Sequence, residues 1–549
     1  MAPRAQSTGE RRSPGPWRRH LGTALLLVVA LGLYAPTLRY GFVWDDHDFI
    51  EANPAVRAPG LLARVPALLG LGFGASPFVG APSPYYRPLV VLGFAVDGRL
   101  GGGRPLVFHL TNVLLNAAAV LLVRALLRRG GCGERWAILG ALLFAAHPLH
   151  VESVAWSVGR TDVLATVWFL AAWLAFLALT ARERAGGPDR VLPVLAPVAF
   201  ALALLAKEVA IVLPLLALPG LRGGGRRTRV GLFTLLGVAA VYLLARSHAL
   251  AAGSAPAASA PLAERVLQAP LVFGRALAAL LWPWSPCPVQ DASRATAPVL
   301  AALGALVAPA VAAAVSGTWR RRLAPWGRAA LLFTLTLLPV SGIVPLPMPF
   351  ADRFLYLPSV ALVWALALAG ERWERSAAAP VRRIAPIVAV LLACGWSVRT
   401  VTYAPVWRDD VALFTRILER WPQSAPALNE LGVAWSDRGE PARARPPLER
   451  AVRLAPGFAP AHFNLARVLE AQRDTLAAVG ELRAALQLQP NAAGVPRHLL
   501  RLLAGAGRLT EAVPDLERAA GAGSAEAAAL LRELRARQGA GAPPASPGS

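Results

Sequence analysis

The sequence predicts an all-α protein in two parts, a polytopic membrane domain followed by an α-solenoid of short repeats. Three observations carry this prediction: the 549 residues are 55% hydrophobic, apolar runs follow one another between residues 21 and 402, and a 34-residue period begins after them. The mean hydropathy of +0.48 is typical of a membrane protein rather than a soluble one. The formal charge of +24 does not indicate nucleic-acid binding, because the arginines cluster between apolar runs as membrane topology requires.

About eleven apolar runs are predicted to cross the membrane, which takes about 20 residues, or somewhat fewer in a short helix. The first, residues 21–38, follows a basic, Pro-rich stretch of residues 1–20 that we expect to be disordered and cytoplasmic. A cleaved signal peptide is the alternative for this run, but many apolar runs follow and no clear small-x-small cleavage motif is present. The other ten runs are 105–127, 136–156, 163–180, 191–206, 209–221, 230–245, 297–315, 329–344, 355–369 and 384–401.

The arginine-rich loops fix the predicted orientation, because positively charged loops stay in the cytoplasm. They alternate with loops that are poor in arginine, which places the N-terminus inside and the repeats outside. Residues 266–284 are apolar enough to cross, but a further crossing would break this alternation, and Trp282, Pro283 and Trp284 suit a helix at the membrane interface. The chain has one lysine, Lys207, and this preference for arginine indicates a GC-rich bacterial genome. We therefore expect an inner-membrane protein with periplasmic repeats.

The repeat region is predicted from residue types that recur every 34 residues, which is the period of tetratricopeptide repeats. Residues 403–424 form a connecting half-repeat, residues 425–522 about three repeats, and residues 523–549 a terminal helix with a Gly/Pro/Ser-rich tail. Such an array offers a concave surface to a protein or peptide; alternatively, it only braces the membrane domain. The recurring residues are Pro422, Pro456 and Pro490; Leu431, Leu465 and Leu499; Ala444, Ala478 and Ala512; Leu448, Leu482 and Leu516; and Ala451, Ala485 and Ala519.

An acidic pair, Asp45 and Asp46, directly follows the first predicted span at the outer face. A carboxylate in this position can deprotonate a hydroxyl acceptor as it attacks the anomeric carbon of a sugar. The second carboxylate could orient the acceptor or hold a divalent cation. The alternative is a solvated loop or a helix cap. Nothing in the sequence gives a role to His47 or Asp48.

Three other motifs fall on or near the same outer side: HPLHVES, the AKE tip at residues 206–208, and ADRFLYLP. Basic residues of two of these motifs, and of YRPL before the second span, suit a phosphate. Arg87 in YRPL and Arg353 in ADRFLYLP could neutralise a phosphate, and the compact ammonium of Lys207 suits a phosphate oxygen. Each has a structural alternative. These are an interfacial arginine for Arg87, an aromatic belt with one anchoring charge for Arg353, and an internal ion pair at a helix hairpin for Lys207 and Glu208.

The densest polar motif is HPLHVESVAWSVGRTD, residues 147–162. A helix would place His147 and His150 on one face, with Glu152 close behind, and hydrogen bonds to a sugar or phosphate are the favoured interpretation. A metal site is the alternative, although the spacing is generic and Pro148 disrupts a helix. Arg160 and Asp162 could simply pair with each other.

Taken together, these strings resemble one known family. WDD, YRPL, FHLTN, HPLHVESVAWSVGRTDVLA, AKE and ADRFLYLPS occur in this order before the repeats, and the pattern closely resembles the transmembrane and tetratricopeptide-repeat-containing proteins from about residue 21 to residue 520. Animal members are O-mannosyltransferases, and the family resembles the C-type membrane glycosyltransferases, which use polyprenyl-phosphate sugars. The resemblance implies that Asp45 and Asp46 are the acidic motif of the first extracytoplasmic loop. It implies as candidate donor or acceptor contacts Arg87, His147, His150, Glu152, Arg160, Lys207, Glu208 and Arg353.

The sequence therefore predicts an inverting glycosyltransferase that moves a hexose, with mannose suggested by the resemblance, from a polyprenyl-phosphate donor to a hydroxyl of a protein or glycan held near the repeats. Asp45 is the expected base and Asp46 the alternative. No cofactor is required and no metal ligands are assigned, but a divalent cation stays open; three scattered cysteines fit no thiolate metal site. The rival hypotheses are a membrane scaffold that recruits partners through its repeats, and a transporter or flippase for a lipid-linked sugar.

Overall fold

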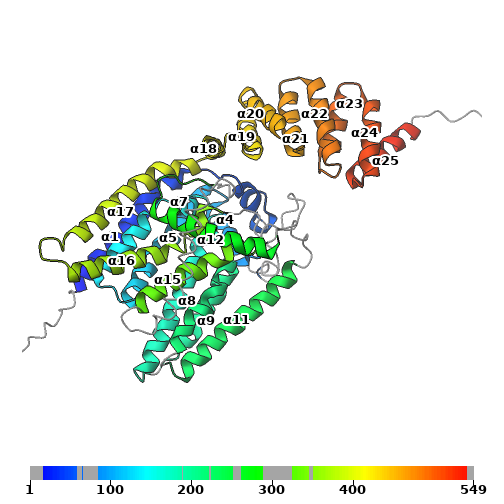
Figure 1. Cartoon of the computed structure of the whole chain (residues 1–549). Helices are drawn as coiled ribbons and strands as arrows, with labels where there is room; N and C mark the ends of the chain where they lie inside the picture. The colour runs from blue at the N-terminus through cyan, green and yellow to red at the C-terminus, as the bar shows by residue number, and fades with distance from the viewer. Residues whose placement is uncertain are drawn as a thin grey trace, which may run out of the picture. The chain divides into compact units, whose positions relative to one another are not determined.

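The computed structural model describes residues 16–57, 65, 85–187, 189–221, 224–250, 261–288, 324–344 and 350–540, and their regular elements are helices (Figure 1), which confirms the all-α class. The chain divides into two compact units, Met1–Arg408 and Asp409–Ser549. The first unit contains the apolar runs and the second contains the 34-residue period.

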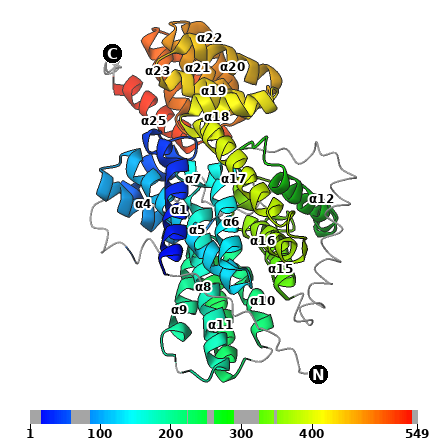
Figure 2. The ribbon, with the colours of Figure 1, turned by 90° about the vertical axis from the view of Figure 1, so that its left-hand side faces the viewer.

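Five helices of the first unit are long and apolar enough to cross a membrane. The first combines α1 (Pro16–Tyr34) with the 3-10 helix η1 (Ala35–Arg39), and the last combines α17 (Ile384–Tyr403) with η8 (Ala404–Trp407). Between them lie α5 (Pro105–Arg129), α8 (Arg160–Arg184) and α11 (Arg226–Leu250). Each corresponds to one predicted crossing. Figure 2 shows α1, α5 and α6 (Glu134–Ala146) running alongside one another.

Several other predicted crossings form shorter or broken elements. Residues 136–156 are two helices, α6 and α7 (His150–Ala155), because Pro148 lacks the N–H group that a continuous helix needs. Residues 191–206 form α9 (Leu192–Ala206), and residues 209–221 are split among η3 (Glu208–Val212), α10 (Leu213–Ala217) and η4 (Leu218–Leu221).

Towards the end of the first unit, α15 (Ala324–Leu337), η6 (Leu338–Val340), η7 (Asp352–Leu355) and α16 (Ser359–Ser376) cover the runs 329–344 and 355–369. Residues 297–315 lie outside the described residues. The segment 266–284 contains α12 (Leu262–Leu281), which is not among the five membrane-capable helices; its interfacial placement stays a prediction. Helix α4 (Pro88–Gly101) was not predicted from the sequence.

Small residues let α5, α6 and α16 pack closely, as in other membrane helix bundles. A Cβ atom on Gly370 of α16 would lie 2.1 Å from the indole of Trp136 in α6. A Cβ atom on Gly140 of α6 would lie 2.4 Å from a methyl group of Leu127 in α5. The contact at Gly370 therefore favours glycine strongly because the indole is rigid, whereas at Gly140 the flexible Leu127 side chain can move aside.

We expect Gly370→Ala to destabilise the first unit by about 1–3 kcal/mol, because the added methyl group must displace the Trp136 indole from a packed core. Thermal unfolding in detergent, followed by tryptophan fluorescence, measures the effect. The control is Gly237→Ala in α11, where a Cβ atom would meet nothing within 4 Å. Equal melting temperatures for the two variants would contradict the close packing of α6 on α16.

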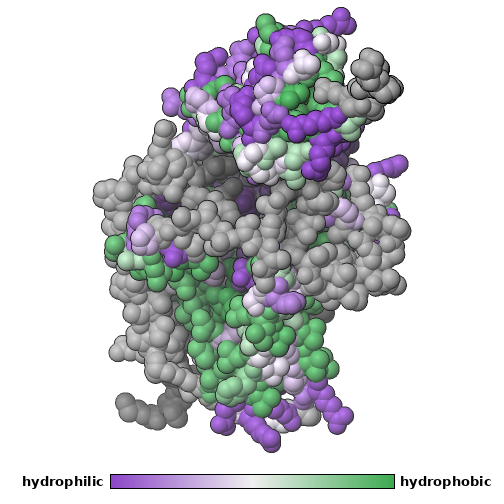
Figure 3. All heavy atoms as spheres, turned by 90° about the vertical axis from the view of Figure 1, so that its right-hand side faces the viewer, coloured by the Kyte–Doolittle hydropathy of each residue, from purple (hydrophilic) through white to green (hydrophobic). Residues whose placement is uncertain are grey.

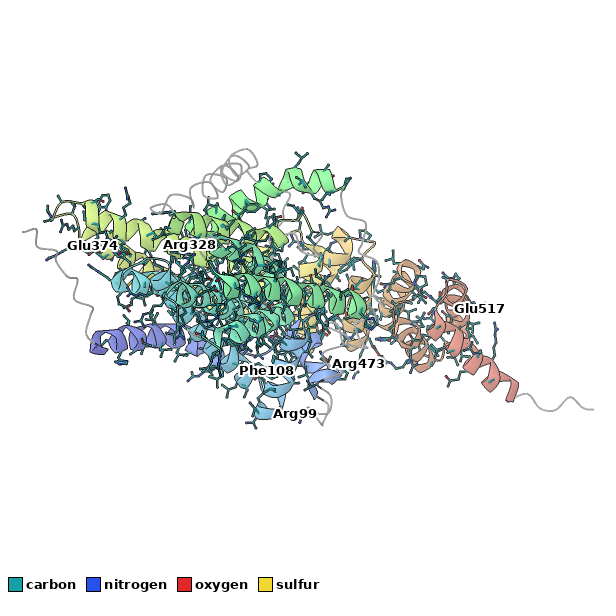
Figure 4. The ribbon with its side chains drawn as sticks, turned by 90° about the horizontal axis from the view of Figure 1, so that it is seen from below. Arg99, Phe108, Arg328, Glu374, Arg473 and Glu517 are labelled. Carbon is teal, nitrogen blue, oxygen red and sulfur yellow. The ribbon has the colours of Figure 1, made fainter. Side chains whose placement is uncertain are left out.

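The outer surface of the first unit suits lipid on the side where α11 lies. Figure 3 shows a broad hydrophobic surface there that ends in hydrophilic residues at its lower end. Exposed apolar residues of α11 include Val230, Phe233 and Val241. Figure 4 shows Glu374 of α16, the partner of Arg135, well separated from Phe108 in the first turns of α5. The end of α16 thus lies apart from the start of α5.

The second unit consists of α18 (Asp410–Arg420), three consecutive helix pairs and α25 (Ala525–Ala540). Residues spaced by 34 have the same environment: Leu448, Leu482 and Leu516 are fully buried, as are Ala444, Ala478 and Ala512. The period in the sequence therefore corresponds to a period in packing. The pairs are α19 (Ala425–Asp437) with α20 (Pro441–Leu454), α21 (Ala459–Ala471) with α22 (Thr475–Leu488), and α23 (Val495–Gly505) with α24 (Ala512–Gly521).

Candidate functional site

The loop that carries the acidic pair, residues 40–46, is anchored to three other parts of the first unit. The Gly41 N–H group donates to the carbonyl oxygen of Arg408 at 3.1 Å. Nε2 of His109 lies 3.2 Å from the Gly41 carbonyl oxygen. The Trp156 indole N–H group donates to the carbonyl oxygen of Val43 at 3.3 Å. A π-helical turn, η2 (His47–Glu51), continues the chain.

Asp46 is fully buried and holds this loop in place. Its Oδ2 atom accepts a hydrogen bond from the Val43 N–H group at 3.2 Å, and its Oδ1 atom accepts one from the Val158 N–H group at 2.9 Å. Burial raises the pKa of Asp46 to about 7, against the opposing effect of these two hydrogen bonds. With both oxygens occupied by backbone N–H groups, Asp46 links two segments of the chain. Its side chain is neither solvated nor the cap of the helix η2 that follows, so neither structural alternative for the acidic pair describes it.

Asp45 has a different environment although it is the adjacent residue. Its side chain is only partly buried, and no described residue donates a hydrogen bond to its carboxylate. Burial raises the pKa of Asp45 to about 6; the charge of Asp48 also raises this pKa, and the charge of Arg353 lowers it. Asp45 is thus a carboxylate with free acceptor capacity whose pKa is moved towards neutrality, as a general base requires.

Asp45 lies near Arg353, which belongs to a cluster of three ion pairs whose charges interact with one another. Arg87 binds Glu208 through two hydrogen bonds, Nη2–Oε1 at 2.7 Å and Nε–Oε2 at 3.2 Å. The Lys207 ammonium lies 2.6 Å from Oδ1 of Asp162. The third pair joins Arg353 to Glu152 through the guanidinium, and the Arg353 backbone N–H group also donates to Oε2 of Glu152 at 3.0 Å.

The three pairs come from segments that are far apart in the sequence. Arg87 directly precedes α4, Glu152 lies in α7, and Asp162 lies in the first turn of α8. Lys207 and Glu208 form the junction between α9 and η3, and Arg353 lies in η7.

Aromatic rings line this cluster. The Arg87 guanidinium carbon lies 4.3 Å from the ring centroid of Tyr85, and Arg353 lies 5.4 Å from that of Trp156. The Tyr85 hydroxyl interacts electrostatically with Arg87, Glu208, Arg353 and Asp45, which places two of the pairs and the aspartate around one ring. The third pair adjoins them, because Lys207 interacts electrostatically with Arg87 and Glu208.

The charges of this cluster do not balance. Three cations pair with three carboxylates, and Asp45 is the fourth carboxylate, with no ion-pair partner within 4 Å among the described residues. The nearby charge of Arg353 lowers the pKa of Asp45 and so favours its ionised form, although the two side chains form no ion pair. The geometry therefore singles out Asp45 from the other acidic residues of the site.

Two of the residues predicted as substrate contacts, His147 and His150, have structural partners. His147 Nε2 lies 3.1 Å from the Leu280 carbonyl oxygen, and His150 Nε2 lies 2.9 Å from Oγ of Ser359; both histidines are fully buried. The sequence predicts that the two histidines share one face of a helix. The structure differs, because one helix ends at Ala146 and the next begins at His150. In the described part of the chain, no group of three His, Cys, Asp or Glu residues is placed to hold a metal ion.

The pairing of the charged residues also differs from the sequence-based alternatives. Arg160 pairs with Asp97 at 2.5 Å and donates to Asn112 at 2.8 Å, rather than pairing with Asp162. Lys207 pairs with Asp162 rather than with its neighbour Glu208. Tyr85 and Asp162 were missing from the predicted site. The adjacent YRPL motif was the available signal for Tyr85.

Comparisons with known proteins confirm the predicted resemblance. No family model matches the chain. The chain is 28% identical to protein O-mannosyl-transferase Tmtc1 of Drosophila melanogaster over 550 residues, which covers 81% of this chain and 62% of that protein. It is 39% identical to Drosophila Tmtc2 over 187 residues, 33% of this chain and 20% of that one. Against human TMTC1 it is 37% identical over 179 residues, 31% and 20% of the two chains. The chain thus spans less than two thirds of these relatives.

Solved structures give a weaker likeness. The archaeal oligosaccharyltransferase AglB from Archaeoglobus fulgidus, in complex with an inhibitory peptide and a dolichol-phosphate, matches with a TM-score of 0.41 and 14% identity over 71% of this chain and 56% of that one. The apo form of the oligosaccharyltransferase from the same species matches with a TM-score of 0.42 and the same identity and coverage. Likeness at this level supports no inference about the fold or the function.

Proposed function

We propose that this chain, a relative of the protein O-mannosyl-transferases, is an inverting membrane glycosyltransferase of the C type. It transfers a hexose, with mannose as the first candidate, from a polyprenyl-phosphate donor to a hydroxyl group of a protein or glycan on the extracytoplasmic side. The observation that carries the proposal is the environment of Asp45. It is a partly exposed carboxylate to which no described residue donates a hydrogen bond, and it lies near Arg353 of the cluster of three ion pairs.

In the proposed reaction, the Asp45 carboxylate accepts the proton of the acceptor hydroxyl group as its oxygen attacks the anomeric carbon. The bond between the anomeric carbon and the phosphate oxygen breaks, and the polyprenyl phosphate leaves with the electron pair. A single displacement inverts the anomeric configuration. The carboxylates of the cluster also stabilise the positive charge that develops on the sugar in the transition state.

The cations of the cluster are the proposed contacts for the phosphate that leaves. Arg87 and Arg353 have planar guanidinium groups suited to phosphate oxygens, and Lys207 adds a compact ammonium. Glu208, Glu152 and Asp162 hold these cations in fixed positions before the donor binds, so little reorganisation is needed during the reaction. His147, His150 and Arg160 are left out of this scheme, because their described partners are helix-packing contacts.

The proposed orientation follows from the two ends of α8. Asp162 of the cluster lies in its first turn, and Arg182 and Arg184 lie in its last turn. At about 1.5 Å of rise per residue, Asp162 and the two arginines are roughly 30–33 Å apart along the helix. If the arginines face the cytoplasm of a bacterial cell, the cluster faces the periplasm. We propose that the helix pairs of the second unit form a tetratricopeptide-type solenoid that presents the acceptor on the same side.

The proposal is tested with purified protein in liposomes that contain a labelled polyprenyl-phosphate mannose. Acceptors are identified by comparing the envelope glycoproteins of a deletion strain with those of its parent. Repeating the assay with EDTA tests the divalent cation that the sequence leaves open. A membrane scaffold, the rival hypothesis, would consume no donor in this assay.

The transfer rate is expected to rise as the pH increases through about 6. Burial raises the pKa of Asp45 to about 6, so below that pH the carboxylate is protonated and cannot accept the hydroxyl proton. Rates are measured in proteoliposomes from about pH 5 to about pH 8. The control is the residual activity of Asp45→Asn, whose rate must not fall as the pH decreases through about 6. This fall in rate is called the acidic limb of the pH profile. A wild-type rate that is constant over the range would contradict the assignment.

A further inference from the structure

Trp44, the residue before Asp45, has an unusual backbone conformation. Its φ angle is +53°, and among the described residues only Arg473 is another non-glycine residue with positive φ. A bulky side chain rarely adopts this region, because its Cβ atom approaches the backbone too closely. Such a conformation persists only where the surroundings impose it, and it is found preferentially at functional sites.

A stack of three indole rings holds Trp44 in this conformation. The Trp44 ring lies 5.3 Å from that of Trp156 with an interplanar angle of 20°, and Trp156 lies 5.4 Å from Trp407 at 23°. Trp156 and Trp407 are buried. The stack therefore gives Trp44 a rigid support, and the middle ring of that support also lies against the Arg353 guanidinium.

The residues on both sides of the Trp44–Asp45 dipeptide are fixed independently. Val43 accepts a hydrogen bond from the Trp156 indole and donates one to Asp46, and Asp46 also accepts one from Val158. Between these anchors, the left-handed turn at Trp44 lets two adjacent aspartates point differently. Asp46 is fully buried, whereas Asp45 stays partly exposed beside the ion pairs.

We propose that Trp44 is the positioning residue of the site: its stacked ring and left-handed backbone direct the Asp45 carboxylate towards the acceptor hydroxyl. This inference rests on the proposed role of Asp45 as the base. Trp44 itself takes no part in proton transfer. Its contribution is the fixed direction of its neighbour, and a loss of alignment of about 1 Å lowers a rate on the order of 100-fold.

Three substitutions distinguish the contribution of the Trp44 ring from that of its backbone conformation. Trp44→Phe keeps a stacking ring, Trp44→Gly removes the ring but accepts positive φ without strain, and Trp44→Ala removes the ring and disfavours positive φ. We expect the Phe variant to retain kcat within a few-fold. The Gly and Ala variants should lose kcat on the order of 100-fold with little change in the KM for the donor. Their acidic limb should move to lower pH, because Asp45 becomes better solvated.

The matched control is Trp282→Ala, at a tryptophan that is 74% exposed, which should leave kcat, KM and the pH profile unchanged. Thermal unfolding reports whether each variant is folded. Should the Gly and Ala variants not fold, Trp44→Leu, which keeps apolar volume without a planar ring, is compared with Trp44→Phe in the same assay.

Wild-type kcat and an unmoved acidic limb in the ring-less variants would overturn the role of Trp44. This outcome is distinct from failure of the proposed function. If the wild type transfers no sugar, or if Asp45→Asn transfers at the full rate, the base assignment fails. If the wild type is active and Asp45→Asn is inactive, while all Trp44 variants behave as wild type, only the positioning role fails.

Discussion

Asp45→Asn is expected to lower the rate of sugar transfer by about 10²- to 10⁴-fold while the protein stays folded. The amide cannot accept the hydroxyl proton, so the chemical step loses its base. The folded state loses little, because the Asp45 carboxylate accepts no hydrogen bond from the described residues that an amide would fail to replace. Initial rates in proteoliposomes and melting temperatures in detergent give the two quantities.

Asp46→Asn is the matched comparison, since it makes the same chemical change one residue away. Its amide nitrogen cannot accept from either the Val43 or the Val158 N–H group, so one buried donor loses its partner. This loss costs about 1–3 kcal/mol of stability. Loss of activity should therefore follow loss of stability at Asp46 but not at Asp45. The reverse pattern, with Asp45→Asn unstable and Asp46→Asn stable but inactive, would transfer the role of base to Asp46.

The second large effect is expected on stability. Asp162→Asn should destabilise the first unit by about 3–5 kcal/mol, because it leaves the Lys207 ammonium buried without a counter-charge. The side chains of this pair are only 4% and 8% exposed. Thermal unfolding in detergent measures the change.

A double replacement and an exposed ion pair serve as controls for Asp162→Asn. Replacing both partners, as Asp162→Leu with Lys207→Met, should recover most of the lost stability, because no unpaired charge remains. Arg135→Ala breaks the pair with Glu374, whose side chains are 56% and 30% exposed, and should change stability by about 1 kcal/mol or less. If Asp162→Asn unfolds no more readily than Arg135→Ala, the buried pair does not contribute as described.

Much of the site could be predicted because arginine placement orients the apolar runs. That orientation puts separated motifs on one face, and the structure does bring Asp45, Arg87, Glu152, Lys207, Glu208 and Arg353 together. The pairing could not be predicted. Arg87 and Glu208 are separated by 121 positions, and nothing in the sequence indicates that Lys207 prefers Asp162 over the adjacent Glu208.

The different roles of Asp45 and Asp46 could not be predicted from the sequence either. Adjacent identical residues differ only through the fold, which buries Asp46 between two backbone N–H groups and leaves Asp45 beside the cluster. The positive φ angle of Trp44 could not be predicted from the sequence, because tryptophan does not favour this backbone conformation.

For the fold, apolar runs of about 20 residues gave the five long helices. The shorter elements escaped prediction because hydropathy does not distinguish a crossing from a packed half-helix, as at the break between α6 and α7. The 34-residue period, in contrast, is a signal that does not depend on hydropathy, and it matches the recurring burial of Leu448, Leu482 and Leu516.

In the proposed reaction, Asp45 activates a hydroxyl group for a single displacement at a polyprenyl-phosphate sugar. The most direct test of this proposal measures the anomeric configuration of the glycoside formed, together with the release of polyprenyl phosphate, in proteoliposomes of the wild type and of Asp45→Asn. We expect an inverted linkage and a matched release of polyprenyl phosphate from the wild type, and neither from the variant. A retained configuration, or donor consumption by Asp45→Asn at the wild-type rate, would contradict the proposed reaction.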